Sequence, residues 1–194
     1  MKGVKGPGTA ERILDVAERM VQERGFNGFS YADIAAELRV SKPALHYHYP
    51  GKAELGVALV DRYTARFTEA LASLDNAGLS APATLAGYAN LYLAVLREHR
   101  MCLCGMLAAE YTTLPEPMQA SVLAFFAANE AWLTTVLDRG ITDGTVHVTG
   151  ATGDAAATIV SGLEGAMLLA RPHTDLTRFE TAAAALLAGF TRLP

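Results

Sequence analysis

The stretch from Ser41 to Gly51 constrains the fold more than any other, because it confines a helix to about two turns. Ser41 is a good N-cap, and Pro43 falls in the first helical turn, where its missing N–H costs little. Pro50 then stops the helix. Because a helix this short is marginal by itself, we expect neighbouring elements to hold it while its outer face contacts another molecule.

A second short helix precedes this one and is joined to it by a tight turn. Ser30 is its expected N-cap, and Ile34 and Leu38 present apolar side chains at helical spacing. Two short helices in this order predict a helix-turn-helix, whose second helix enters a DNA major groove. An amphipathic helix over residues 9–24, with Thr9 as its expected N-cap, completes a predicted three-helix head.

The rest of the chain also follows helical periodicity, and no stretch shows a convincing strand pattern. The sequence therefore predicts an all-α fold of about nine helices. The six helices expected after the head cover residues 52–75, 82–99, 106–111, 117–139, 154–170 and 175–191.

Composition supports a compact helical protein with an uneven charge distribution. Hydrophobic residues make up 51% of the chain and charged residues 19%, which is enough apolar surface for a sizeable core. The net charge is −4, yet residues 1–52 hold eight Lys and Arg against six Asp and Glu. A mildly basic head on an acidic body suits a head that approaches phosphate.

The sequence also gives expectations about the compartment. Two cysteines and a charged N-terminal region without an apolar core indicate a reducing, cytoplasmic setting without a structural disulfide. The uncharged run over residues 76–96 contains Pro82 and Asn90, so we interpret it as a loop and a buried helix. No membrane partner is expected.

Two ordered motifs resemble those of TetR-type transcriptional regulators. Residues 45–55 read Leu-His-Tyr-His-Tyr-Pro-Gly-Lys-Ala-Glu-Leu, similar to the family pattern Leu-Tyr-x-His-Phe-x-x-Lys-x-x-Leu. Residues 25–35 read Gly-Phe-Asn-Gly-Phe-Ser-Tyr-Ala-Asp-Ile-Ala, which resembles the family's Gly-Phe/Tyr…Thr-x-x-Asp/Glu-Ile-Ala signature. The strong resemblance covers residues 9–60.

The resemblance implies a homodimeric repressor whose heads bind a palindromic double-stranded operator and are shifted apart by an unknown small-molecule effector. Residues 1–8 are Gly-rich and basic, which predicts a flexible arm. The domains expected after it are a DNA-binding domain at 9–51 and a ligand-binding and dimerisation domain at 52–194. The resemblance implies no catalysis and no cofactor. A helical enzyme is the rival class, but no Ser/His/Asp order, metal motif or phosphate loop supports it.

The expected DNA contacts gather around the second helix of the motif. Lys42 is placed to reach guanine and Ala44 to contact a thymine methyl. Lys52 and the family positions Tyr47 and His48 are expected near phosphate. The predicted DNA-contacting residues are Tyr31, Lys42, Pro43, Ala44, His46, Tyr47, His48 and Lys52.

Cys102-x-Cys104 leaves three interpretations open. The thiols are core or pocket-wall residues, a redox or electrophile sensor, or part of a metal site. Metal needs three or four convergent ligands, and the sequence offers no second cluster. His46 and His48 lie two apart on a helix and so point apart. We expect no metal; switching by thiol oxidation or electrophile modification at Cys102 and Cys104 is the alternative to a bound ligand.

The helices of the body are expected to enclose a mostly apolar ligand pocket. The candidate lining residues are Tyr88, Tyr92, Cys104, Met106, Tyr111, Phe125, Asn129, Trp132 and Met167. Glu110, Glu130 and Glu164 stand in apolar surroundings, where a buried acid needs a partner or a raised pKa. We expect Glu164 at the dimer seam.

The last two helices supply the expected dimer interface. Small residues permit close helix approach, and large apolar residues supply the buried area. The predicted interface residues are Gly162, Leu163, Gly165, Ala166, Leu169, Phe179, Leu186, Leu187 and Phe190.

Overall fold

A computed structural model describes residues 8–191, and within this range it contains nine α-helices. The expected arm at residues 1–8 lies, apart from Gly8, outside the described residues. The all-α class and the nine helices are confirmed. The helices are α1 (Thr9–Arg24), α2 (Tyr31–Leu38), α3 (Lys42–His48), α4 (Lys52–Asn76), α5 (Ala81–Arg97), α6 (Leu103–Ala109), α7 (Glu116–Thr142), α8 (Thr152–Ala170) and α9 (Leu176–Ala188). Two short 3₁₀ turns, η1 (Tyr111–Thr113) and η2 (Arg171–His173), complete the order.

The chain forms two compact units. The first, called the head unit below, contains residues 1–63 and 103–122; the second, called the body unit, contains residues 64–102 and 123–194. This division does not coincide with a boundary at residue 52, because α4 and α7 each contribute to both units and α6 packs with the head.

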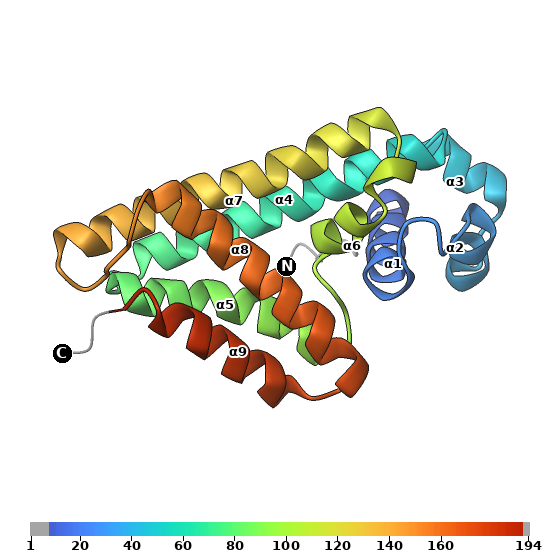
Figure 1. The fold of residues 1–194 in the computed structure, drawn as a ribbon. Coiled ribbons are helices and arrows are strands. Elements are labelled where there is room, and N and C mark those ends of the chain that lie inside the picture. Colours follow the sequence, from blue (N-terminus) through green and yellow to red (C-terminus); the bar gives the residue numbers. More distant parts are fainter. Residues whose placement is uncertain (1–7, 192–194) are drawn as a thin grey trace, which may run out of the picture. The chain divides into compact units, whose positions relative to one another are not determined.

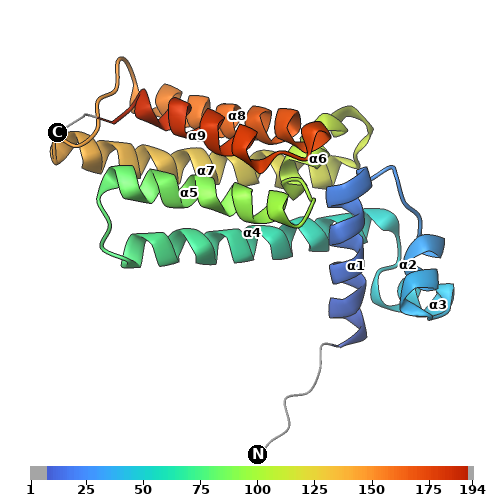
Figure 2. The same cartoon turned by 90° about the horizontal axis from the view of Figure 1, so that it is seen from below.

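The head unit is organised around α1, which contacts α2, α3 and α6 (Figure 2). Ile13, Ile34 and Leu45, from α1, α2 and α3, are all fully buried. Ser30 caps α2 as expected: both its N–H and its hydroxyl donate to the Asp33 carboxylate at 2.7 Å. The N-cap of α1 is Gly8 and not Thr9, since the Gly8 N–H donates to the Glu11 carboxylate at 2.9 Å.

The body unit contains an antiparallel α8–α9 pair that packs against α5 (Figure 1). Tyr88, Leu163 and Phe179, one from each of the three helices, are buried. Among the described helices, α7 alone is long and apolar enough to pass a test for a membrane span. Because its Phe125 and Leu133 are buried within the body unit, α7 is a core helix.

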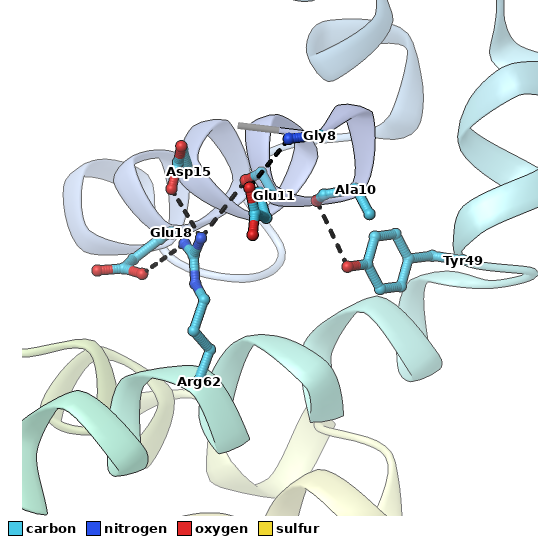
Figure 3. A network of polar contacts seen from close by, with 7 residues as sticks. All are labelled: Gly8, Ala10, Glu11, Asp15, Glu18, Tyr49 and Arg62. Carbon is cyan, nitrogen blue, oxygen red and sulfur yellow. Dashed lines mark hydrogen bonds and ion pairs between the residues drawn. The ribbon is translucent and has the colours of Figure 1, made fainter. Parts of the chain in front are cut away.

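Arg62 of α4 ties this helix to α1 in the head unit (Figure 3). Its guanidinium forms ion pairs with Asp15 at 2.7 Å and with Glu18 at 2.8 Å. The Glu18 side chain is only 10% exposed and that of Arg62 20% exposed. The ion pair between Arg62 and Glu18 is therefore largely shielded from water.

Arg62→Ala is expected to lower the free energy of unfolding by about 2 kcal/mol, because it leaves the shielded Glu18 carboxylate without its cation. Urea unfolding followed by circular dichroism measures this loss. Arg12→Ala, an exposed change on α1, is the matched control, and we expect it to stay within about 0.5 kcal/mol of the unmodified protein. Equal unfolding midpoints for the two variants would contradict the structural role of Arg62.

Candidate DNA-binding and ligand-binding sites

The outer face of α3 is free in the head unit. Lys42, Pro43 and His46 are exposed, and the Tyr47 side chain is 85% exposed. A tyrosine this exposed on a seven-residue helix contributes nothing to the core of the head. Ala44 and His48 are half-buried at the edges of the same face.

The inner face of α3 anchors it. Leu45 is fully buried, and the Tyr49 hydroxyl, just after the helix, donates to the Ala10 carbonyl at 3.4 Å (Figure 3). Arg39 has a φ of 55° and ends α2 in the left-handed region, which turns the chain into α3. The short helix α3 is therefore anchored by Leu45 and by Tyr49, and it exposes only its outer side.

Tyr31 and His46 have partners inside the head. The Tyr31 hydroxyl lies 2.9 Å from the Tyr49 carbonyl and 2.7 Å from the Gly51 carbonyl, and its one proton serves these two acceptors. Burial raises the pKa of Tyr31 to about 12. The His46 ring packs on Tyr31 at 4.8 Å, and its Nδ1 lies 2.9 Å from the Pro50 carbonyl. Both residues thus hold the link from α3 to α4, which the sequence pattern did not reveal.

Of the predicted DNA-contacting residues, Lys52 departs most from its expected role as a phosphate contact. Its ammonium donates to the carbonyls of Phe26 and Phe29, each at 2.5 Å, and lies 4.6 and 4.3 Å from the centroids of their rings. Burial lowers the pKa of Lys52, and the charges of Glu110 and Asp33 offset part of this shift. The lysine that resembles a family DNA contact is directed into the head and closes the turn after α1.

Glu110, just after α6, holds the same turn from another direction. Its carboxylate accepts from the N–H of Phe26 at 2.5 Å and of Asn27 at 3.2 Å. The Asn27 amide donates to the Thr113 hydroxyl at 2.8 Å. Gly25 has a φ of 83°, and a Cβ there would lie 2.8 Å from a Glu110 carboxylate oxygen. These contacts explain why segment 103–122 belongs to the head unit.

Five ring side chains of the body unit, called the aromatic cluster below, surround a short chain of hydrogen bonds. Because the Tyr88 hydroxyl donates to the Asn129 side-chain oxygen at 3.1 Å, the Tyr92 hydroxyl donates to Tyr88 at 3.0 Å. Asn129 donates to the Phe125 carbonyl at 2.8 Å. The aromatic cluster consists of Phe67, Tyr88, Tyr92, Phe125 and Trp132.

Glu164 of α8 is half-buried beside this cluster, and its place at the dimer seam stays a prediction. Burial raises the pKa of Glu164 to about 7, and a hydrogen bond from the Cys102 thiol opposes the shift. Its Oε1 atom is buried and has no hydrogen-bond partner. The raised pKa expected for an acid in apolar surroundings is thus confirmed at Glu164.

Both cysteines are buried, and neither forms a disulfide. Cys102 is 1% exposed and Cys104 is fully buried, whereas a sensor thiol needs access to its oxidant or electrophile. Among residues 8–191, no three His, Cys, Asp or Glu side chains gather as a metal site.

The remaining candidate pocket residues fall into both compact units. Met167 is buried on α8 in the body unit. Cys104 and Met106 lie on α6 and Tyr111 in η1, and all three belong to the head unit. The structure therefore brings Tyr88, Tyr92, Phe125, Asn129 and Trp132 together as one group, and it does not include the other candidates in that group.

Several predicted dimer residues are used inside the protomer. Leu163, Phe179 and Leu187 are buried, so they supply no free apolar area. A Cβ on Gly162 would lie 2.6 Å from Leu186 Cδ2; this glycine therefore lets α8 approach α9 within one chain. Ala166 and Phe190 are half-buried.

Part of the predicted interface remains available on α8. Leu169 is 65% exposed. Its neighbour Leu168, which was not among the predicted interface residues, is 60% exposed. A Cβ on Gly165 would meet nothing within 4 Å. Leu168 was missed because it is one position away from the expected apolar stripe.

A helix-turn-helix with a free outer face, followed by a helical body, defines a DNA-binding transcriptional regulator. The sequence matches the description "Bacterial regulatory proteins, tetR family" over residues 13–59 and "Tetracyclin repressor-like, C-terminal domain" over residues 81–186. The chain belongs to the TetR family. Its members bind operator DNA through the N-terminal domain and have a C-terminal domain for dimerisation and ligand binding. Because this is a family of regulators, the expectation that the chain is not an enzyme is confirmed.

Known proteins resemble the chain over most of its length. A TetR family regulator from Agrobacterium tumefaciens is 32% identical, with a TM-score of 0.91 over 94% of this chain and 97% of its own. A TetR regulator from Legionella pneumophila is also 32% identical, with a TM-score of 0.88 over 97% and 100%. The transcriptional repressor NemR of Escherichia coli K12 is 25% identical over 136 residues, which is 68% of each protein.

Lys52→Met is expected to lower the free energy of unfolding by about 1–3 kcal/mol, because two carbonyls of the head lose their donor. Urea unfolding measures the loss, and Lys42→Met on the exposed face is the matched control. In buffer without urea, Lys52→Met should leave the salt dependence of DNA binding unchanged, since the Lys52 ammonium contacts backbone carbonyls of the protein and not DNA phosphate. If Lys52→Met shows a flatter salt dependence of DNA binding, Lys52 contacts phosphate and its assignment to the backbone carbonyls is wrong.

Stability should fall as the pH rises from about 5 to about 8. Glu164 takes up its proton more readily in the folded state, where its pKa is about 7, than in the unfolded state, where it is near the ordinary value of 4.5. The folded state is therefore favoured most at low pH and loses up to about 3 kcal/mol as the pH passes through that window. Urea unfolding at both pH values should show a smaller difference for Glu164→Gln, and an identical difference would contradict the assignment.

Proposed function

We propose that the protein is a homodimeric repressor that binds a palindromic operator and is released from it by a small-molecule effector. The observation that supports this best is the outer face of α3, where Lys42 and Tyr47 are exposed while Leu45 is fully buried. A short helix with one anchored and one open face suits insertion into a major groove.

On this face, Lys42 reads a guanine edge and Ala44 a thymine methyl, with Pro43 beside them. Tyr47 and His48 contact phosphate and set the register of the helix on the duplex. Lys52, Tyr31 and His46 act indirectly, because their polar groups hold the head in the shape that presents α3. Direct contacts therefore come from fewer residues than the motif alone implies.

Dimerisation uses the outer surface of α8, where Gly165 permits close approach and Leu168 and Leu169 are exposed. Two large leucines that are 60% and 65% exposed, adjacent on one helix, favour burial against a second copy. A two-fold axis that passes beside the exposed surface of α8 pairs this surface with itself, as an isologous interface requires.

The effector acts through segment 103–122, which follows Cys102 directly in the chain. At the far end of the seven-residue α6, Glu110 holds the backbone of Phe26 and Asn27. A shift of α6 on effector binding pulls on the turn that connects α1 to α2, and so reorients the helix-turn-helix. Ligand binding is preferred over thiol chemistry because both cysteines are buried.

The experiment that tests this function starts from an operator selected by the purified protein from random DNA. Lys42→Ala is expected to lose about 10-fold to 100-fold affinity for that operator and to relax its preference at one base pair. Tyr47→Ala is expected to weaken binding to specific and unrelated DNA alike, because its contact is with phosphate. Fluorescence anisotropy at several salt concentrations measures both effects.

Arg97→Ala on α5 of the body unit is the matched control, since it removes an exposed cation outside the head. We expect it to bind the operator as the unmodified protein does. Failure to select any preferred DNA sequence would reject the proposed function, and a uniform loss for Lys42→Ala would assign that residue to phosphate.

A further inference from the structure

The polar groups in and beside the aromatic cluster have used all their hydroxyl and indole donors, while some of their acceptors remain unused. Every hydroxyl and indole donor in it already has an acceptor: Tyr92 donates to Tyr88, Tyr88 donates to Asn129, and the Trp132 indole donates to Asp75 at 2.8 Å. The Cys102 thiol beside the cluster donates to Glu164. What remains on these side chains is acceptor capacity.

Among these side chains, Glu164 most clearly lacks a hydrogen-bond donor. Its Oε1 is buried and receives no donor, although a carboxylate oxygen shielded from water normally has one. In the described residues no ion pair reaches Glu164. Leaving such an oxygen unpaired is costly, so a group that brings a donor to it gains more than it would in water.

The local charges point the same way. Besides burial, the groups that raise the pKa of Tyr88 are Cys102, Glu164 and Glu130, all of which become negative when ionised. Aromatic rings also attract cations through their faces. Phe67, Trp132 and Glu164 are only half-buried, so part of each side chain is accessible to solvent. The surroundings are therefore apolar and rich in acceptors.

We propose that the effector is an amine, and that its protonated nitrogen donates to Glu164 while its apolar part packs on the aromatic cluster. This assignment rests on the proposed function, to which it adds the chemical class of the ligand. A carboxylate or phosphate ligand would bring more acceptors and a like charge to Glu164, and is disfavoured for both reasons.

The test uses two probes that share a benzyl group and differ in charge, benzylamine and phenylacetate. Isothermal titration calorimetry on the full-length protein measures binding of each at millimolar concentration. We expect benzylamine to bind and phenylacetate to bind at least about 10-fold more weakly. Glu164→Gln should weaken benzylamine by about 10-fold or more, because the cation loses its charged partner.

Glu69→Gln is the matched control, since it removes an exposed carboxylate of α4 from the same compact unit. We expect it to bind benzylamine as the unmodified protein does. Circular dichroism verifies that both variants fold. The proposal is overturned if benzylamine does not bind, if phenylacetate binds as tightly, or if the two variants lose affinity equally.

Operator binding by anisotropy, run in parallel, separates this inference from the proposed function. If the protein binds its operator but benzylamine fails at Glu164, the amine class is rejected and the repressor remains. If benzylamine binds through Glu164 while operator affinity is unchanged, the binding chemistry holds and release by this class of ligand is rejected.

Discussion

Two side chains of opposite charge hold the turn between α1 and α2. One donates to its carbonyls, and the other accepts from its N–H groups. The Lys52 ammonium donates to the carbonyls of Phe26 and Phe29, while the Glu110 carboxylate accepts from the N–H groups of Phe26 and Asn27. The backbone groups of a non-helical turn otherwise depend on water, so this arrangement replaces solvent with fixed charges. The position of α2 and α3 on α1 depends on it.

This arrangement gives a physical meaning to the division of the chain. Segment 103–122 is distant from the helix-turn-helix in sequence and yet shares its compact unit, because Glu110 and Thr113 bond to the turn. The family description assigns residues 81–186 to a C-terminal domain. Structurally, part of that domain supports the DNA-binding head, and a regulator needs such a connection if events in the body are to reach the DNA.

The roles of side chains were less predictable than the elements that carry them. Leu45 of α3 is fully buried, and the Tyr49 hydroxyl just after this helix bonds to the Ala10 carbonyl of α1. Lys52 was expected at phosphate, but its ammonium lies against two phenylalanine rings. A long flexible side chain at the start of a helix reaches in several directions, and only the surrounding atoms decide which direction is used.

The sequence by itself determined the helices, the caps at Ser30 and Ser41, the helix-turn-helix and the family, because periodicity and capping act over a few neighbouring residues. Only the tertiary structure decided that Glu110 holds a backbone 84 residues away. It also decided that Leu163 and Phe179 fill the protomer interior while Leu169 stays exposed. Apolar residues on a helix look alike in sequence, and the way helices pack determines which of them face a neighbour in the same chain.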